Sequence, residues 1–157
     1  MIEKLDRLID EVGALQSKLV LLIGAPGSGK TALLQSLAKS KGVTPLNVGV
    51  ELGGRLAGMP QRQRHLQATT ILREQADQHA PGDLLLLDNI ELLFDRSLQL
   101  DPLDLLKRHA HAMRVVAVWP GALQGDARTG RLTYADMGHP EHQDYSLTSV
   151  VPFEIQQ

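Results

Sequence analysis

An octapeptide near the start of the chain, GAPGSGKT at residues 24–31, combines the residue types that bind a phosphate chain. It fits the pattern G-x-x-x-x-G-K-[ST], in which glycines let successive backbone N–H groups turn toward an anion. Lys30 would reach the β- and γ-phosphates, and the Thr31 hydroxyl would hold Mg²⁺. The motif therefore predicts that ATP and Mg²⁺ bind to the residues Gly24, Ala25, Pro26, Gly27, Ser28, Gly29, Lys30, Thr31 and Ala32.

The residues on either side of this loop supply the strand and the helix that the motif requires. Residues 19–23 are all apolar, which is typical of a strand buried on both faces. After the loop, Leu33, Leu34, Leu37 and Ala38 fall at helical spacing. A helix that starts here would direct the positive end of its dipole at the phosphates.

A second apolar run, LLLLD at residues 84–88, predicts another buried strand that ends in a carboxylate. In phosphate-loop proteins such an aspartate lies beside the loop threonine and holds Mg²⁺, so Asp88 and Thr31 are the expected metal ligands. Many ATPases place a glutamate directly after this aspartate to polarise the attacking water, but here that residue is Asn89, a poor base. The nearest carboxylate is Glu91, which either orients water or is a first-turn charge at a helix N-terminus.

Residues 115–119 predict a further buried strand, which would lie between the two strands above in an additional-strand arrangement. Such a strand presents a polar side chain to the γ-phosphate, but Trp119 and Pro120 stand at that place. Trp119 offers only its indole N–H, which favours a place in the core or against adenine.

The remaining patterns complete an α/β fold in one domain, residues 1–157. We expect a three-layer sandwich around a mainly parallel sheet of about five strands. An amphipathic helix spans residues 1–16, either packed on the sheet edge or docking another protein, and an irregular strand and loop segment spans 120–157. Between them, the patterns predict a strand at 46–50, a turn at 53–58, helices at 66–79 and from residue 102, and strands at 131–135 and 145–155.

Composition excludes several classes of protein. The chain has a net charge of −2 and a pI near 6.3, so it has no overall basic field for nucleic acid. It has no cysteine, no apolar run long enough for a membrane span and no secretory signal, so we expect a cytoplasmic protein. Arg55, Arg62 and Arg64 make the densest positive stretch, which is either a solvated face or a contact for nucleic acid or an acidic partner.

Four segments together resemble a known family: GAPGSGKTALL, LLLLDNIELLFD, VVAVWPG and RLTYADMGHPEH. They resemble the BrxF family of small P-loop proteins found in some BREX phage-defence systems. The fold is also similar to the core of AAA+ ATPases, without their C-terminal helical lid. The resemblance implies a prokaryotic cytoplasmic protein that acts with other BREX proteins against phage DNA.

The leading hypothesis is an ATP-binding and ATP-hydrolysing subunit in which Lys30, Glu91 and Asn89 contact the reacting groups. Without a lid, one side of the nucleotide would be exposed, so we expect a homo-oligomer whose neighbouring subunit adds an arginine. Arg128 is the candidate, with Arg108 and Arg114 as alternatives. Two other hypotheses stay open: a nucleotide switch or scaffold that does not hydrolyse ATP, and a small-molecule kinase whose lid would be the arginines at residues 62–64.

Overall fold

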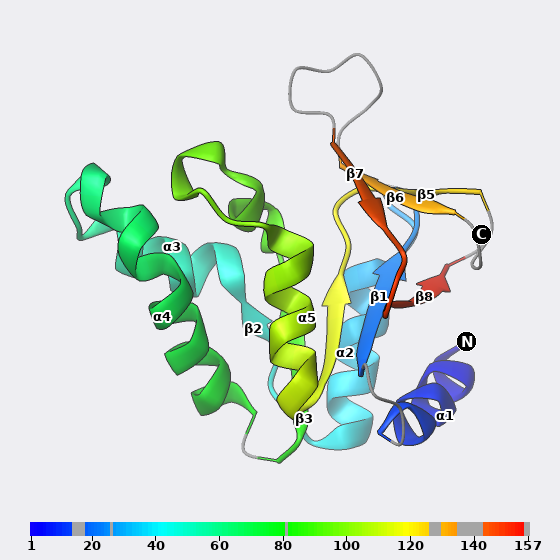
Figure 1. Cartoon of the computed structure of the whole chain (residues 1–157). Coiled ribbons are helices and arrows are strands. Elements are labelled where there is room, and N and C mark those ends of the chain that lie inside the picture. The colour runs from blue at the N-terminus through cyan, green and yellow to red at the C-terminus, as the bar shows by residue number, and fades with distance from the viewer. Residues whose placement is uncertain (14–17, 26, 81, 126–129, 135–142, 156–157) are drawn as a thin grey trace.

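A computed structural model describes residues 1–13, 18–25, 27–80, 82–125, 130–134 and 143–155 (Figure 1). In this part of the chain, five parallel strands form the central sheet in the order β2-β3-β4-β1-β8. Because all of them run the same way, their carboxyl ends meet at one edge, where open α/β sheets bind ligands. The strands are β1 (Leu19–Ile23), β2 (Leu46–Asn47), β3 (Leu84–Asp88), β4 (Arg114–Val118) and β8 (Val151–Glu154).

The middle of the sheet has the additional-strand arrangement that the sequence predicts. β4 lies between β1 and β3, with Val20 beside Val116 on one side and Leu85 beside Val115 on the other. All five residues of β1 and the first four of β3 are buried, as expected for strands covered on both faces. The predicted fold class, an α/β sandwich around a parallel sheet with an additional strand, is confirmed.

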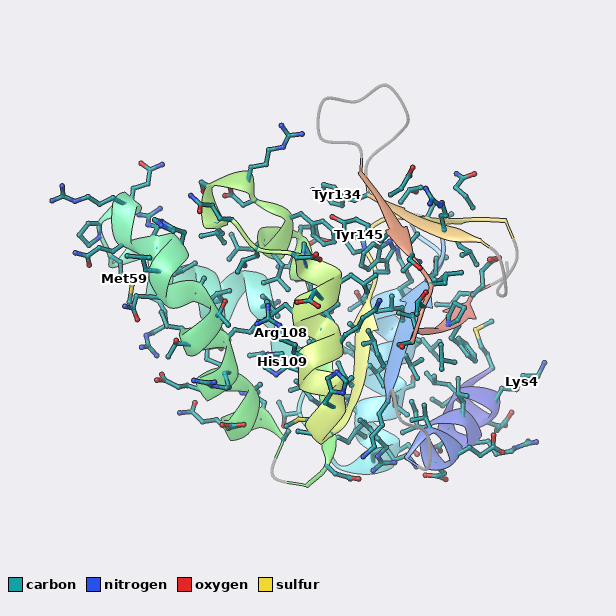
Figure 2. The ribbon with its side chains drawn as sticks, viewed as in Figure 1. Lys4, Met59, Arg108, His109, Tyr134 and Tyr145 are labelled. Atoms are coloured by element: carbon teal, nitrogen blue, oxygen red, sulfur yellow. The ribbon has the colours of Figure 1, made fainter. Side chains whose placement is uncertain are left out.

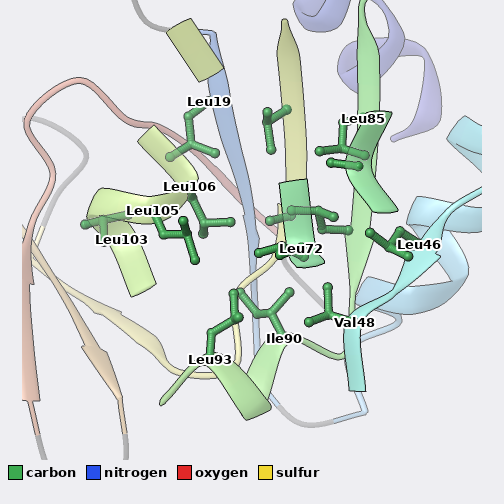
Figure 3. Close-up of a cluster of buried hydrophobic side chains, with 14 of the residues drawn as sticks. Leu19, Leu46, Val48, Leu72, Leu85, Ile90, Leu93, Leu103, Leu105 and Leu106 are labelled. Atoms are coloured by element: carbon green, nitrogen blue, oxygen red, sulfur yellow. The ribbon is translucent and has the colours of Figure 1, made fainter. Parts of the chain in front are cut away.

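Helices cover both faces of the sheet and make it a three-layer sandwich. Alternate strand residues face opposite sides, so Val20 and Leu22 pack with one group of helices, and Leu19 and Leu21 pack with the other. The first layer holds α1 (Ile2–Val12) and α2 (Lys30–Lys41). The second layer, part of which Figure 3 shows, holds α3 (Val48–Ala57), α4 (Gln61–His79) and α5 (Pro102–Ala112).

The strand expected at residues 46–50 is present but ends at Asn47, and the turn expected at 53–58 is wrong, because residues 48–57 form α3. β2 stops at Asn47, whose side chain accepts a hydrogen bond from the Val50 N–H at 3.1 Å and so caps α3. The buried residues Val48, Leu52 and Leu56 repeat every four positions, and this helical period prevails over the alternation and the glycines. The helix expected at 66–79 begins earlier, at Gln61 directly after Pro60.

The C-terminal part forms more regular structure than the sequence predicts. A small antiparallel sheet contains β5 (Ala122–Gln124), β6 (Arg131–Tyr134) and β7 (Gln143–Ser146). The single strand expected at 145–155 is two strands, since Ser149 adopts a left-handed φ of 65° and the chain turns between β7 and β8. Alternating side chains continue through this turn, so the pattern hides it. Among the described helices, none is long and apolar enough to cross a membrane.

Candidate nucleotide-binding site

The phosphate-binding loop joins β1 to α2 at the carboxyl edge of the sheet. Gly27 and Gly29 have φ angles of 79° and 92°, a left-handed backbone that side chains with a Cβ rarely adopt. A Cβ at either residue would meet nothing within 4 Å, so the surface beside them is open. Pro26, in the middle of the loop, lies outside the described residues.

The first turn of α2 supplies donors to the same open surface. Gly29 is the N-cap and, among the described residues, no side chain caps this end of the helix or adds an acidic group to its first turn. The Leu33 N–H donates to the Gly29 carbonyl at 2.9 Å, so the N–H groups of residues 30–32 precede the first helical hydrogen bond. The Ser28 hydroxyl is buried and has no hydrogen-bond partner in the described part of the chain. The N–H groups of residues 30–32 suit a phosphate chain, which accepts several hydrogen bonds at once.

Lys30 and Thr31 face the ends of the neighbouring strands. Lys30 Nζ donates to the Trp119 carbonyl, directly after β4, at 3.2 Å. Partial burial lowers the pKa of the Lys30 ammonium, and the Glu91 carboxylate opposes this by raising it. Thr31 Oγ1 donates to Asp88 Oδ1, at the end of β3, at 3.3 Å. A hydroxyl and a carboxylate in contact at this edge fit a Mg²⁺ ion, which prefers oxygen ligands.

Asn89 and Glu91, which follow Asp88, have different surroundings. Asn89 has a left-handed φ of 54°, and its side chain donates to Asn47 Oδ1 at 3.1 Å. The Gly49 N–H donates to the Asn89 carbonyl at 3.0 Å, so Asn89 ties the end of β3 to the start of α3. Glu91 lies in the first turn of the 3-10 helix η1 (Ile90–Phe94), where its side chain is exposed and its charge acts on Lys30.

Asn47 is the residue that the sequence analysis missed. Its side chain accepts two hydrogen bonds, from the Val50 N–H and from Asn89 Nδ2, each at 3.1 Å. The signal was present, because an asparagine is a preferred N-cap residue. The expected strand over 46–50 concealed it.

Trp119 lies in the core and directs no side-chain group at the loop. Its side chain has no exposed surface, and the indole N–H donates to the Thr133 carbonyl of β6 at 3.0 Å. The ring makes edge contacts with Phe94 and Tyr145, with centroids 5.3 and 5.4 Å away. The sequence allowed this side chain to lie either in the core or against adenine, and the structure places it in the core. The backbone carbonyl of Trp119, and not its side chain, contacts Lys30.

The three arginines considered for a shared site have different surroundings. Arg128 lies outside the described residues. Arg114 begins β4 at the opposite edge of the sheet, where its guanidinium donates to the Ile9 carbonyl at 3.1 Å and to Asp83 at 2.7 Å. Arg108 is exposed on α5 and forms an ion pair with Asp104 at 3.0 Å. Arg114 thus holds α1 and β3 together.

The comparison with protein families matches the same part of the fold. The sequence model of the ATPase family associated with various cellular activities (AAA) matches residues 20–118, more than half of the chain. The chain belongs to the AAA family. The matched AAA core runs from β1 to the end of β4, so it includes the loop, Asp88 and Glu91, whereas β5 to β8 follow it. No curated protein matches the chain closely enough to be called a relative.

Proposed function

We propose that this AAA protein binds and hydrolyses ATP as a subunit of a BREX-type anti-phage defence system. The observation that carries the nucleotide part is the 3.3 Å contact between Thr31 Oγ1 and Asp88 Oδ1, beside an open glycine loop. These two residues would hold Mg²⁺, which lowers the charge on the phosphates when ATP is bound. Lys30 and the first-turn N–H groups of α2 would bind the β- and γ-phosphates.

The hydrolytic part of the proposal assigns different roles to Glu91 and Asn89. Glu91 is exposed directly after β3, and its charge opposes the lowering of the Lys30 pKa that burial causes. Its carboxylate is the group that would orient water and accept a proton from it. Asn89 would act as a positioning residue, since its amide is bonded to Asn47. Its backbone N–H donates to Asp88 Oδ1 at 2.8 Å and so helps to orient that carboxylate.

The test is phosphate release from ATP and Mg²⁺ by three forms of the protein. We expect turnover by the wild type, none above background for Lys30→Ala, and a loss of 100-fold or more, on the order of one general base, for Glu91→Gln. Glu91→Gln should still bind ATP. Wild-type turnover equal to that of Lys30→Ala would contradict hydrolysis.

Oligomerisation is the second part of the proposal, since Arg108 and Arg114 are paired away from the loop in their own chain. Turnover per subunit should fall on dilution if a neighbouring subunit completes the site. Constant turnover per subunit across the dilution series would show that one chain suffices.

The BREX assignment is supported by sequence resemblance, above all in VVAVWPG and RLTYADMGHPEH. It predicts that a host carrying the system with Lys30→Ala in this chain loses resistance to phage, and that the wild-type chain co-purifies with other proteins of the system. Unchanged plating of phage on the variant host would contradict the assignment.

A second function, a nucleotide switch or scaffold that does not hydrolyse ATP, is favoured by one observation. The residue that follows Asp88 is an amide engaged with Asn47 and not a free carboxylate. ATP binding with no phosphate release above the Lys30→Ala background would establish this function. No observation on the described residues favours a kinase, because Arg62 and Arg64 lie in the first turn of α4 and Arg64 donates to the Met59 carbonyl and not to the phosphate loop.

A further inference from the structure

The outer part of the α3–α4 helix pair carries an unusual charge. From Leu52 to Arg73 the chain has four arginines and no acidic residue, although the whole chain has 18 acidic and 16 basic residues. We call these four the arginine surface: Arg55 in the last turn of α3, and Arg62, Arg64 and Arg73 on α4. These four arginines are a quarter of the basic residues, and the rest of the chain has 12 basic and 18 acidic residues, two of which, Glu51 and Glu74, border the stretch.

The arginine surface lies at the margin of the molecule. Figure 2 shows Met59 at the tip of the α3–α4 pair, on the side of the sheet away from α1. Arg55 and Arg62 flank this tip and are exposed. Arg64 is half-buried, and its Nε donates to the Met59 carbonyl at 3.2 Å, so Arg64 also holds the turn.

One side of α4 continues the positive surface along the helix. Arg62 and Arg73 are eleven residues apart, which is three turns, so both point to the same side about 16 Å from one another along the axis. Both are exposed, as are Gln63 and Gln67 between them. Arg62, Arg73 and the two glutamines can donate hydrogen bonds to phosphate oxygens, and the exposed side chain of Leu66 lies one turn after Arg62 on the same side.

Two acidic residues lie one helical turn from these arginines, Glu51 before Arg55 on α3 and Asp77 after Arg73 on α4. Arg55, Arg62 and Arg73 form no ion pair with any described residue. Arg62 and Arg64 also stand in the first turn of α4, where the helix dipole disfavours positive charge and where no described side chain caps the helix. A sequence that departs from such a local rule commonly does so for function, and a bound anion would relieve the repulsion.

We propose that the arginine surface binds the phosphate backbone of duplex DNA without regard to its sequence. A protein partner would require an apolar centre, but in the described α3–α4 pair the large apolar side chains that are highly exposed are Val50 at 63% and Leu66 at 66%, on different helices. Single strands are bound mainly by stacking on aromatic rings, and residues 48–79 contain no Phe, Tyr or Trp and only two histidines, His65 and His79, neither highly exposed. The wide major groove of DNA admits a helix, whereas that of duplex RNA is narrow. This proposal does not depend on ATP binding.

The test is fluorescence anisotropy of a short labelled DNA duplex, titrated with full-length protein in the absence of nucleotide. The affinity should fall as salt is added. In a plot of log K against the logarithm of the salt concentration, each phosphate contact should add about 0.9 to the downward slope. At 0.1 M salt this slope corresponds to about eightfold in affinity per contact. The variant Arg55→Gln/Arg62→Gln/Arg73→Gln should therefore lose nearly all affinity. The slope of its salt dependence should fall by the amount expected for about three phosphate contacts.

A matched control removes the same charge from the other side of the molecule. Lys4→Gln/Arg7→Gln/Lys39→Gln changes three exposed residues of α1 and α2 that form no described ion pair. We expect this variant to bind DNA as the wild type does and both variants to keep the wild-type unfolding temperature. Equal loss of affinity in the two variants would overturn the proposal, because only net charge would then matter.

Three competitors test the identity of the ligand. Single-stranded DNA, duplex RNA and a poly-glutamate peptide should each displace the labelled duplex less well than unlabelled duplex DNA. Displacement by any of them at an equal or lower concentration, or no binding of wild type to DNA at low salt, would refute the proposal. The Lys30→Ala variant should bind DNA normally, so failure at the nucleotide site and failure at the arginine surface are distinguishable.

Discussion

Replacing Trp119 distinguishes a core residue from a wall of the nucleotide pocket. The side chain is fully buried, donates one hydrogen bond to Thr133, and packs against Phe94 and Tyr145. Removing a large buried aromatic costs about 3–5 kcal/mol. Trp119→Phe keeps one ring but loses the hydrogen bond, worth about 1 kcal/mol, and part of the packing, so we expect a cost of about 2 kcal/mol.

Thermal unfolding followed by circular dichroism measures this cost. In a domain of this size 1 kcal/mol shifts the midpoint by about 2–4 °C, so Trp119→Phe should lower it by about 4–8 °C and Trp119→Ala by about 6–20 °C. Phe153→Leu, at a half-buried position on the edge strand β8, is the control and should cost about 1 kcal/mol or less.

The affinity for ATP decides between the two interpretations. Lys30 contacts the backbone carbonyl of Trp119 and not its ring. Trp119→Phe should therefore bind ATP as the wild type does at a temperature where both are folded. An unchanged unfolding midpoint together with a tenfold weaker affinity for ATP, which corresponds to about 1.4 kcal/mol, would refute the assignment of Trp119 to the core.

Three other predictions follow from the site and its supports. A Cβ on Gly49 would collide with Asn89 Nδ2, so Gly49→Ala should lower the free energy of unfolding by about 1–3 kcal/mol. Gly54 lies on the same helix in open space, so Gly54→Ala should raise this free energy by up to about 1 kcal/mol. A urea titration measures both. In Asp88→Asn, Mg²⁺ should no longer strengthen the binding of ATP. Titration of the protein with a fluorescent ATP analogue, in Mg²⁺ or in EDTA, measures this effect. If Mg²⁺ strengthens binding as much as in the wild type, Asp88 is not a Mg²⁺ ligand. Burial raises the pKa of Tyr145 to about 12 from an unfolded value near 10, so stability is full below pH 10 and falls as pH rises toward 12. In Tyr145→Phe this alkaline loss of stability should be smaller, and an identical pH profile would show that Tyr145 does not cause it.

The parts of the fold that the sequence predicts correctly depend on strong local patterns. Uninterrupted apolar runs predict β1, β3 and β4. Asp101 followed by Pro102 predicts the start of α5, where the Asp101 side chain accepts a hydrogen bond from the Asp104 N–H at 3.1 Å. The glycine loop placed Lys30 and Thr31 at the carboxyl edge of the sheet, and the carboxylate that ends β3 placed Asp88 beside them.

The parts that the sequence does not predict depend on contacts between distant residues. The cap from Asn47 and the bond to Asn89 turn an apparent strand into α3. The place of Trp119 is set by β6 and by ring contacts to Phe94 and Tyr145, up to 26 residues away in the sequence. No local pattern around Trp119 shows that these segments meet, so the sequence alone left its side chain either in the core or beside adenine.

The central claim is that the loop and Asp88 form an ATP site, and calorimetric titration of the purified protein with ATP and Mg²⁺ tests it most directly. We predict that wild type and Lys39→Ala, which changes an exposed lysine of α2, bind with the same affinity. Lys30→Ala should bind at least about tenfold more weakly, since it loses charged hydrogen bonds worth about 1.5–3 kcal/mol. Absence of binding by the wild type, or equal binding by Lys30→Ala, would contradict the claim.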